Sequence, residues 1–264
     1  MDPSIPFARK SLGQHFLIDP NIVRKIVALA DLQPHEAVFE IGPGRGILTE
    51  ALCRVANRVV AVEVDPRLHI YLSERRSAFP HLELVCADAL TFPIETLSQG
   101  TVVVANLPYN ISTPLLFRLL EAGSRFSRMV LMLQTEVVAR LVARPGRREY
   151  GLLSVMAQSA AEIVEGFRVS AQCFRPRPEV GSTVVSLRRR STPLVQNVRQ
   201  DVFHRVVKAA FAHRRKTLPN SFRDEGYEFD RVLEALQALG LSPTVRAETL
   251  SVDQFIQLAS RIEK

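Results

Sequence analysis

The chain contains little cysteine, and its cysteines are not arranged in pairs. Only three occur among 264 residues, Cys53, Cys86 and Cys173, and they stand far apart in apolar stretches. No Cys-x-x-Cys spacing is present, which argues against a metal site or a redox motif. We therefore expect these thiols to be small core side chains in a protein of a reducing cytoplasm.

Long apolar runs are also missing. No apolar segment follows the first charged residue at the N-terminus, so a secretory signal is not expected. The longest apolar stretches, such as residues 129–133, are far shorter than the ~20 residues that cross a bilayer. With 47% hydrophobic and 23% charged residues the composition is that of an ordinary globular protein. We therefore expect a cytoplasmic protein that does not bind a membrane.

Positive charge is concentrated in one part of the chain. The net charge is +7 at pH 7, and residues 168–223 hold thirteen Lys or Arg against two acids, Glu179 and Asp201. The rest of the chain is therefore slightly acidic. A basic excess confined to one segment predicts a surface for a polyanion there. Arginines that only keep the surface solvated are the alternative.

Short apolar runs alternate with helical patterns over the first three quarters of the chain. This alternation predicts a doubly wound α/β domain with a mostly parallel sheet. The last two runs, with a long loop between them, predict an antiparallel pair at the edge of the sheet. Thr113 and Pro114 predict a helix start. The strands are expected at 37–41, 59–63, 82–86, 101–106, 129–134, 163–169 and 182–189, and helices at 47–55, 67–76, 114–121 and 136–142.

A polar stretch broken by proline, residues 191–197, predicts a domain boundary. The sequence after it is helical, with a helix that ends at Gly240 and a capping-box signature at Ser251 to Gln254. We therefore expect a larger domain over residues 1–190 and a small, all-helical domain over residues 191–264.

The first expected strand runs into a glycine-rich turn, Glu40-Ile41-Gly42-Pro43-Gly44-Arg45-Gly46. Glycine lets the backbone turn sharply and approach a ligand at the carboxyl edge of an open α/β sheet. Glu63 ends the next strand, where an acid can bind both hydroxyls of a ribose. Asp88 follows the third strand and can accept a hydrogen bond from an adenine amino group. Together these residues indicate a nucleoside-containing cofactor.

The glycine turn is incomplete for a dinucleotide. A G-x-G-x-x-G pattern needs glycine at position 47 or 49, where Ile47 and Thr49 stand. The pattern therefore disfavours NAD and favours a cofactor without a pyrophosphate, such as S-adenosylmethionine. No metal is expected. A glycine turn with a purely structural role, and an Asp88 that only caps a turn, are the alternatives.

Asn106-Leu107-Pro108-Tyr109 follows the fourth strand at the same edge. An adenine amino group is a poor nucleophile because its lone pair is delocalised into the ring. Hydrogen bonds from both amino hydrogens, to the side-chain oxygen of Asn106 and to a backbone carbonyl at Leu107 or Pro108, favour a pyramidal nitrogen. Tyr109 offers a face for stacking the base. The pattern predicts methyl transfer to adenine, and a tight proline turn is the alternative.

Five segments in order resemble the ribosomal RNA adenine N6-dimethyltransferase family. The resemblance covers nearly the whole chain, and its last segment is typical of the bacterial small-subunit branch, the KsgA/RsmA type. The segments are Lys10 to Leu17, the glycine turn from Glu40 to Gly44, Asn106 to Ser112, Cys173 to Ser182, and Phe211 to Asn220.

The resemblance implies a Rossmann-like S-adenosylmethionine-dependent methyltransferase domain and the roles of single residues. It implies that Phe174 lies against the target adenine, opposite Tyr109. His15 stands where many members carry Asn, which puts the role of its side chain in doubt. The residues that the resemblance assigns to S-adenosylmethionine are His15, Leu17, Gly42, Glu63, Asp88 and Asn106, to which the glycine turn adds Gly44.

The resemblance also implies the substrate: two adjacent adenosines near the 3′ end of 16S rRNA, dimethylated during maturation of the small (30S) subunit. We expect the enzyme to be a monomer that binds this RNA in the immature subunit. The basic residues of the C-terminal part can pair with phosphates and orient the RNA without reading its sequence. They are Arg205, Lys208, Arg214, Arg215 and Lys216. Arg188 to Arg190 can extend this surface, and a charge cluster that protects an edge strand is an equally good explanation for them.

Three alternatives stay open. A large-subunit rRNA adenine methyltransferase is disfavoured by Arg214-Arg215-Lys216-Thr217-Leu218. A DNA adenine methyltransferase is disfavoured because such enzymes usually carry Asp-Pro-Pro-Tyr in place of Asn106 to Tyr109. A ribosome assembly factor that acts mainly by binding belongs to a different class, and it is compatible with methyl transfer.

Overall fold

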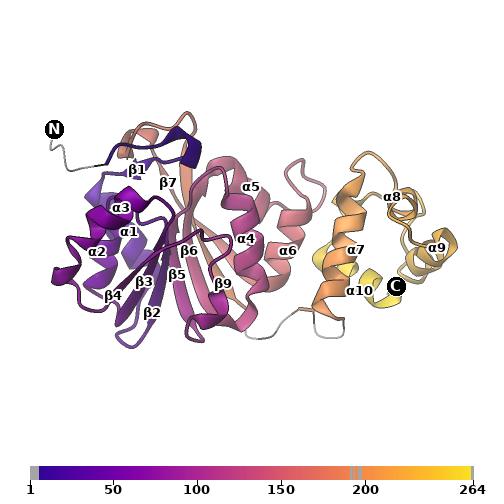
Figure 1. Cartoon of the computed structure of the whole chain (residues 1–264). Coiled ribbons are helices and arrows are strands. Elements are labelled where there is room, and N and C mark those ends of the chain that lie inside the picture. The colour runs from indigo at the N-terminus through magenta and orange to yellow at the C-terminus, as the bar shows by residue number, and fades with distance from the viewer. Residues whose placement is uncertain (1–5, 191, 193, 196–197, 263–264) are drawn as a thin grey trace. The chain divides into compact units, whose positions relative to one another are not determined.

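The computed structural model describes residues 6–190, 192, 194–195 and 198–262 (Figure 1). The chain forms two compact units: unit 1 consists of Met1–Val138 and Ile163–Arg189, and unit 2 of Ala139–Glu162 and Arg190–Lys264. The expected domains, 1–190 and 191–264, differ from these units mainly in residues 139–162, which belong with the C-terminal helices. The expected boundary at 191–197 lies largely outside the described residues, and the division into domains stays a prediction.

Unit 1 is built on a seven-stranded sheet. Its strands are β2 (Ala37–Ile41), β3 (Arg58–Glu63), β4 (Leu82–Cys86), β5 (Thr101–Asn106), β6 (Phe126–Gln134), β7 (Ala161–Val169) and β9 (Ser182–Arg189). They lie in the order β4-β3-β2-β5-β6-β9-β7. The first five are parallel, and β9 runs antiparallel to β6. The predicted α/β fold is confirmed, with the last two strands at one edge.

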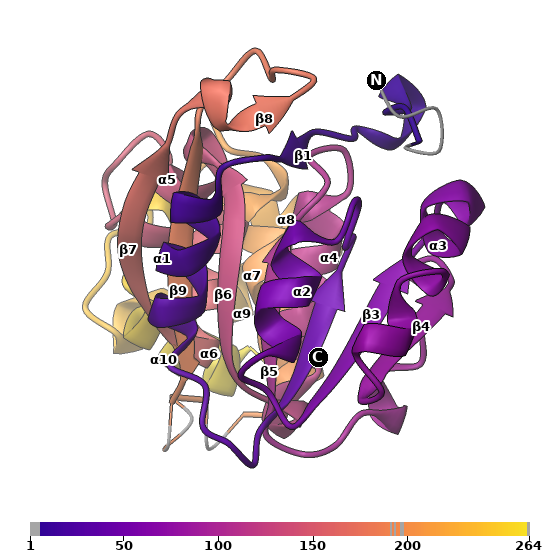
Figure 2. The ribbon, with the colours of Figure 1, turned by 90° about the vertical axis from the view of Figure 1, so that its left-hand side faces the viewer.

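Helices cover both faces of this sheet (Figure 2). They are α1 (Pro20–Ala30), α2 (Ile47–Cys53), α3 (Pro66–Ser73), α4 (Ser112–Glu121) and α5 (Thr135–Val142). Helices α1, α2 and α3 lie on one face and α4 on the other. The core under α1 includes Ile26 packed with Val38 and Val104 of the sheet, all buried. Central strands are continuous apolar runs because both of their faces are covered.

Helix α1 was not predicted from the sequence, although its start carries a clear signal. Asp19 accepts a hydrogen bond from the backbone N–H of Asn21 at 2.8 Å, and Pro20 occupies the first helical position. The same Asp-Pro pair, Asp65 and Pro66, begins α3. A capping carboxylate followed by proline favours a helix start in both places.

Two predictions about single residues were wrong. Thr113 does not cap α4, which begins at Ser112 with Ile111 in the capping position. Cys86 is exposed at the end of an outer strand, whereas Cys53 is buried as expected and Cys173 is partly buried. Among the residues that the structure describes, no helix is long and apolar enough to span a bilayer.

Unit 2 consists of packed helices. They are α6 (Leu152–Ala160), α7 (Gln200–Ala212), α8 (Leu218–Asp224), α9 (Phe229–Ala238) and α10 (Val252–Arg261). Phe203, Phe222 and Phe255 are fully buried among them. The predicted capping box at the start of α10 is confirmed: Ser251 and Gln254 each bind the backbone N–H of the other. Unit 2 is therefore a helical body with an aromatic core.

Candidate active site

A pocket in unit 1 lies at the carboxyl ends of β2, β3 and β5, where their chains turn into loops. The strands bring together loops that are far apart in sequence, as expected for an open α/β sheet. All the residues expected to bind the cofactor, and the tetrapeptide, line this pocket: His15, Leu17, Gly42, Gly44, Glu63, Asp88, Asn106, Leu107, Pro108 and Tyr109. Phe174 does not.

The glycine turn after β2 lies tightly against its neighbours. Gly44 has φ +60°, a left-handed conformation that side chains rarely adopt. A Cβ atom there would stand 3.0 Å from Cδ1 of Phe16. The backbone angle thus favours glycine, and the Phe16 ring, which lies on the turn, leaves little room for a side chain.

Glu63 ends β3 with its carboxylate held in place. Its side chain is 4% exposed and accepts hydrogen bonds from the backbone N–H of Gly44 at 3.1 Å and of Asp65 at 3.0 Å. Burial raises the pKa of this carboxyl group above its ordinary value. The two backbone bonds fix the orientation of Glu63 and leave its remaining lone pairs available to a ligand in the pocket.

Glu40, at the end of β2, was quoted in the sequence motif but given no role. It lines the pocket, is 1% exposed, and its Oε2 atom has no hydrogen-bond partner among the described residues. Burial raises its pKa to about 8, and the nearby Glu63 adds to the rise. A buried oxygen without a partner is costly unless a ligand binds it. The residues of the pocket therefore fit S-adenosylmethionine, which carries an ammonium group and a positive sulfur.

Asn106 is the last residue of β5, and its amide is oriented by the N-terminal segment. Its Nδ2 atom donates a hydrogen bond to the backbone carbonyl of His15 at 3.2 Å. The side-chain oxygen carries no bond from the described residues, so it remains an acceptor. Because the bond uses the Nδ2 atom of the amide, it is the Oδ1 atom that is left to accept a hydrogen bond from a substrate.

The rest of the tetrapeptide is held by backbone and hydroxyl contacts. Leu107 N–H donates to the carbonyl of Met132, and the carbonyl of Pro108 accepts from Ile111 N–H at 3.3 Å. The carbonyl of Leu107 accepts nothing from the residues that the structure covers. Tyr109 Oη lies 2.6 Å from Ser182 Oγ, which fixes the ring, and burial raises the pKa of this phenol.

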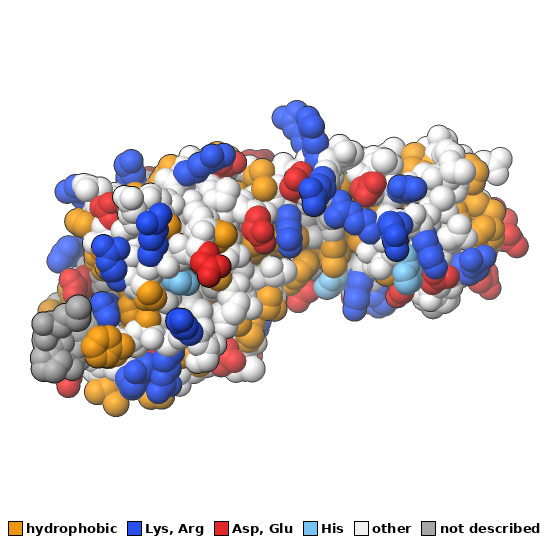
Figure 3. Space-filling model, turned by 90° about the horizontal axis from the view of Figure 1, so that it is seen from above, with side chains coloured by type: hydrophobic (Ala, Val, Ile, Leu, Met, Phe, Trp, Pro, Cys, Tyr) orange, Lys and Arg blue, Asp and Glu red, His pale blue; other side chains and the backbone are white. Residues whose placement is uncertain are grey.

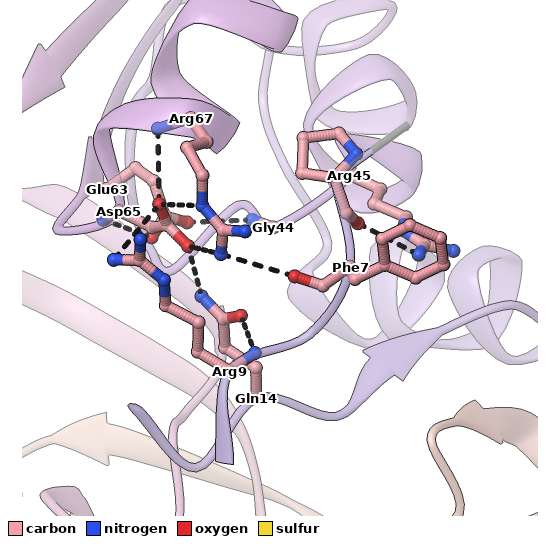
Figure 4. A network of polar contacts seen from close by, with 9 residues as sticks. Phe7, Arg9, Gln14, Gly44, Arg45, Glu63, Asp65 and Arg67 are labelled. Carbon is pink, nitrogen blue, oxygen red and sulfur yellow. Dashed lines mark hydrogen bonds and ion pairs between the residues drawn. The ribbon is translucent and has the colours of Figure 1, made fainter. Parts of the chain in front are cut away.

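Residues 6–17, here called the N-terminal strap, lie along the pocket and are fastened to it (Figure 4). The centre of the fastening is Asp65, whose side chain is fully buried. Gln14 Nε2 donates to Asp65 Oδ2 at 3.2 Å, and Arg67 Nη2 donates to the same atom at 2.7 Å. These contacts, Arg67 foremost, hold the pKa of Asp65 below its ordinary value. No role for Asp65 or its partners was predicted from the sequence.

Two arginines bind the beginning of the strap through its backbone. Arg67 Nη2 also donates to the carbonyl of Phe7 at 3.2 Å, and Arg45 Nη2 to the carbonyl of Pro6 at 3.0 Å. Further along, Gly13 has φ +61°, and a Cβ atom there would lie 2.8 Å from Oδ1 of Asn110. The strap thus packs directly on the loop that follows the tetrapeptide.

The strap ends in a short strand, β1 (Phe16–Leu17), which pairs antiparallel with β8 (Phe174–Arg175). Phe174 is 0% exposed and belongs to the hydrophobic core with Leu17. Its expected contact with a base is therefore not present in this structure, because the ring is enclosed by the core. The stacking role stays a prediction that requires the ring to leave its site.

The ring that faces Tyr109 in this structure is that of His15. The two ring centroids are 5.3 Å apart with an interplanar angle of 31°, and His15 Nδ1 lies 2.9 Å from the carbonyl oxygen of Pro176. A base between two rings needs about 3.5 Å on each side, so none fits between these two. An adenine that stacks on this face of Tyr109 must displace His15.

The position of Asp88 is compatible with both of its predicted roles, a cap of the turn and an acceptor in the cofactor pocket. Its Oδ1 accepts from Leu90 N–H at 2.8 Å, which caps the turn after β4. Its side chain is exposed and lines the pocket. No group of three or more His, Cys, Asp or Glu side chains among the described residues is arranged to hold a metal ion.

The basic residues expected to bind RNA lie in unit 2, but three of them already have acidic partners. Arg205 pairs with Asp201 at 2.8 Å, Arg214 with Glu248 at 3.4 Å, and Lys216 with Asp224. The structure shows no acidic partner for Lys208 and Arg215 in the part of the chain that it describes. Lys and Arg side chains are frequent on the face of the molecule seen in Figure 3.

Comparison with known proteins settles the family. The sequence model of the family described as "Ribosomal RNA adenine dimethylase" matches residues 7–264. The chain belongs to the ribosomal RNA adenine dimethylase family. It is therefore an S-adenosylmethionine-dependent methyltransferase, and the Rossmann-like fold expected from the resemblance is confirmed.

Members and solved structures agree with this assignment. The chain is 42% identical over 266 residues to the ribosomal RNA small subunit methyltransferase A of Moorella thermoacetica, covering 97% of this chain and 92% of that protein. A dimethyladenosine transferase from Plasmodium falciparum has a TM-score of 0.81 at 26% identity, covering 92% and 96% of the two chains. The 23S rRNA methyltransferase ErmE has a TM-score of 0.73 at 29% identity, covering 94% and 100%.

Proposed function

We propose that the protein transfers methyl groups from S-adenosylmethionine to the N6 atoms of two adjacent adenosines near the 3′ end of 16S rRNA, in the immature small ribosomal subunit. The observation that carries the proposal is the fixed amide of Asn106, whose oxygen is left free at the edge of the pocket. The name of the Moorella relative supports the choice of the small subunit.

The pocket binds the cofactor through groups that suit each of its parts. Glu63 accepts from the ribose hydroxyls, Asp88 from the adenine amino group, and Glu40 faces the ammonium group. The glycine turn lets the amino-acid tail approach the backbone, and His15 and Leu17 close the pocket from the strap. When bound, S-adenosylmethionine supplies an electrophilic methyl group on a positively charged sulfur.

The tetrapeptide prepares the nucleophile. The two hydrogens of the adenine amino group donate to Oδ1 of Asn106 and to the carbonyl of Leu107, which is favoured over that of Pro108 because the latter already accepts from Ile111. The nitrogen lone pair then points at the methyl group. The N–C bond forms as the C–S bond breaks, and the alkylated nitrogen, now acidic, loses its proton to water. In a second transfer, which consumes a second S-adenosylmethionine, the one remaining N–H donates to one of these acceptors, and the product is the dimethylated base.

Catalysis here depends on position more than on a strong base. Orientation of two reactants is worth up to ~7–11 kcal/mol of the barrier. Tyr109, fixed through Ser182, stacks the target base once the imidazole ring of His15 has turned aside, while the His15 backbone carbonyl keeps its bond with Asn106. The hydrogen bonds that hold the strap and the tetrapeptide therefore contribute to the rate by keeping the groups that orient the base in position.

The basic residues of unit 2 bind the rRNA backbone. Arg205, Lys208, Arg214, Arg215 and Lys216 contact phosphates, and the helical domain 191–264 thereby presents the substrate to the methyltransferase domain 1–190. We propose that the protein acts as a monomer in the cytoplasm. Binding to the immature subunit also suits a role in assembly, which does not exclude methyl transfer.

The deciding experiment is incubation with labelled S-adenosylmethionine and undermethylated 30S subunits, followed by mapping of the modified bases. We expect label at two adjacent adenines near the 3′ end of 16S rRNA, converted to N6,N6-dimethyladenine. Label in 23S rRNA instead would favour a large-subunit methyltransferase, to which the likeness to ErmE points. Subunit binding without label in either RNA would favour an assembly factor.

A further inference from the structure

The loop between α5 and α6 is an arginine-rich segment of unit 2 to which the sequence analysis gave no role. Arg144, Arg147 and Arg148 lie within five residues, and all three are exposed. Their side chains have no hydrogen bond or ion pair among the residues that the structure describes. We call residues 144–148 the arginine loop.

The arginine loop is ordered by its own turns and by contacts with the C-terminal part of unit 2. Arg147 N–H donates to the carbonyl of Arg144 at 3.2 Å, and Gly146 N–H to the carbonyl of Glu248 at 2.7 Å. Next to the loop, Tyr150 is 1% exposed, and its hydroxyl donates to the carbonyl of Leu250 at 2.8 Å. Contacts with residues about 100 positions later in the sequence therefore hold the loop in place on the surface.

The anchoring contacts bring the loop next to the predicted RNA-binding residues. Arg214 donates to the backbone carbonyl of Arg148 and pairs with Glu248. Arg215 follows directly and has no acidic partner in the described part of the chain. Five guanidinium groups are therefore gathered in one region of unit 2 together with Glu149 and Glu248, while Asp224 and Glu225 lie against the neighbouring His213 and Lys216. Like charges held together repel each other, and a polyanion relieves that cost.

We propose that the arginine loop, together with Arg214 and Arg215, forms a single phosphate-binding surface for the backbone of structured rRNA. This inference rests on the proposed function and adds a second stretch of chain to its RNA site. Guanidinium groups bind phosphates with two parallel hydrogen bonds. Three of them on a fixed loop can follow successive phosphates of an RNA helix.

An anionic membrane is the other polyanion that a basic loop can bind, and the loop does not suit it. Membrane-surface segments pair their basic residues with exposed apolar side chains that enter the lipid. None of the exposed large hydrophobic side chains among the described residues lies in the loop. The observations therefore favour RNA.

The test replaces Arg144, Arg147 and Arg148 together by Ala and measures binding to undermethylated 30S subunits over a range of salt concentrations. Each lost phosphate contact lowers the slope of log K against log salt by about 0.7–0.9, so we expect a decrease of about 2 and a loss of affinity of about 10- to 100-fold at low salt. Replacement by three lysines retains the charge and should restore most of the slope.

A matched variant controls for net charge. Arg54, Arg75 and Arg76 are exposed residues of unit 1, and changing these three to Ala removes the same charge. We expect it to leave affinity and slope near those of the wild type. Equal losses in both variants would show a general charge effect and overturn the proposal.

Two further measurements separate the possible failures. S-adenosylmethionine affinity and thermal unfolding should match the wild type in the loop variant, since the loop lies outside the pocket. If the wild type methylates 16S rRNA and the loop variant binds subunits with unchanged affinity and salt slope, this inference alone fails. If the wild type methylates no 16S adenine, the proposed function fails. Loss of binding to phosphatidylglycerol vesicles with unchanged subunit binding would also overturn the assignment to RNA.

Discussion

The pocket of unit 1 and the basic surface of unit 2 hold their functional side chains in different ways. In the pocket, Glu63 and Asn106 are each fixed by hydrogen bonds to the backbone of another segment. On the basic surface, Arg205 and Lys216 are exposed and bound to acids of their own unit.

Side chains that are held in these two ways contribute differently to function. A fixed group acts through its geometry, so that its loss affects the whole site. An exposed charge acts through the field, and its contribution is small, screened by salt and nearly additive with that of other charges. Substitutions in unit 1 should therefore change rates, and those in unit 2 should change affinity in small steps.

The largest effect is expected from Asn106→Ala. Removal of one preorganised group of an active site costs about 10²- to 10³-fold in turnover. Methyl transfer to 30S subunits at saturating cofactor measures the loss, and affinity for the subunits should stay near that of the wild type. Asn57→Ala, at an exposed position of unit 1, is the matched control. Turnover within threefold of the wild type in the Asn106 variant would contradict the mechanism.

The next effect concerns Glu40 and pH. Its pKa of about 8 in the folded protein lies above the ordinary value of 4.5, so the folded state holds a proton that the unfolded state releases between these values. Stability is therefore lost as the pH rises from about 4.5 to about 8, with a slope of up to about 1.4 kcal/mol per pH unit.

Glu40→Gln removes this titration. Urea unfolding without cofactor measures the free energy of unfolding at each pH. Between pH 5 and pH 8 this free energy should fall less steeply in the variant than in the wild type, the difference in slope being up to about 1.4 kcal/mol per pH unit. Glu74→Gln, at an exposed position on unit 1, should leave the profile unchanged. Parallel profiles for wild type and Glu40→Gln would show that Glu40 is ionised when folded.

A smaller effect is expected from Phe174→Leu. Because the ring is fully buried, an apolar replacement of similar size should cost less than about 1.5 kcal/mol of unfolding free energy. Turnover should remain near that of the wild type if the ring only packs in the core. A fall of tenfold or more, with stability retained, would show that Phe174 reaches the base during the reaction.

The smallest effect compares free and paired cations of unit 2. Lys208→Ala with Arg215→Ala should weaken subunit binding more than Arg205→Ala with Lys216→Ala, because the latter two must first give up acidic partners. We expect a difference of a few fold, since exposed pairs are worth about 0–1 kcal/mol. Titration with labelled 30S subunits measures it, and the reverse order would show that the pairs open freely.

Much of unit 1 could be predicted from sequence because its signals are local. Buried parallel strands are continuous apolar runs, and their carboxyl ends mark the pocket, so Gly42, Glu63 and Asn106 were placed together correctly. The pair β1–β8 left no such signal, because two residues are too few to show a period. The role of Asp65 depends on which arginines reach it, which only the folded chain determines.

The burial of Phe174 and the position of the arginine loop could not be predicted from the sequence for the same reason. A family motif places Phe174 in a segment, but its burial depends on the packing of Leu17 and the core around it. Arg144 to Arg148 precede the basic segment of the sequence by some distance, and the two are joined by contacts such as that of Arg214 with the backbone carbonyl of Arg148. Contacts between distant segments are what periodicity and local motifs do not encode.

The strap also sets the order in which the pocket can be completed during synthesis. Residues 6–17 are synthesised before the other segments that line the pocket, yet Leu17 pairs with Phe174, about 160 residues later, and closing so long a loop costs chain entropy. The glycine turn, β3 and the tetrapeptide are all made before that partner. The wall of the pocket that the strap forms is therefore finished late, and the enzyme cannot assemble its full cofactor site on a nascent chain that ends before β8.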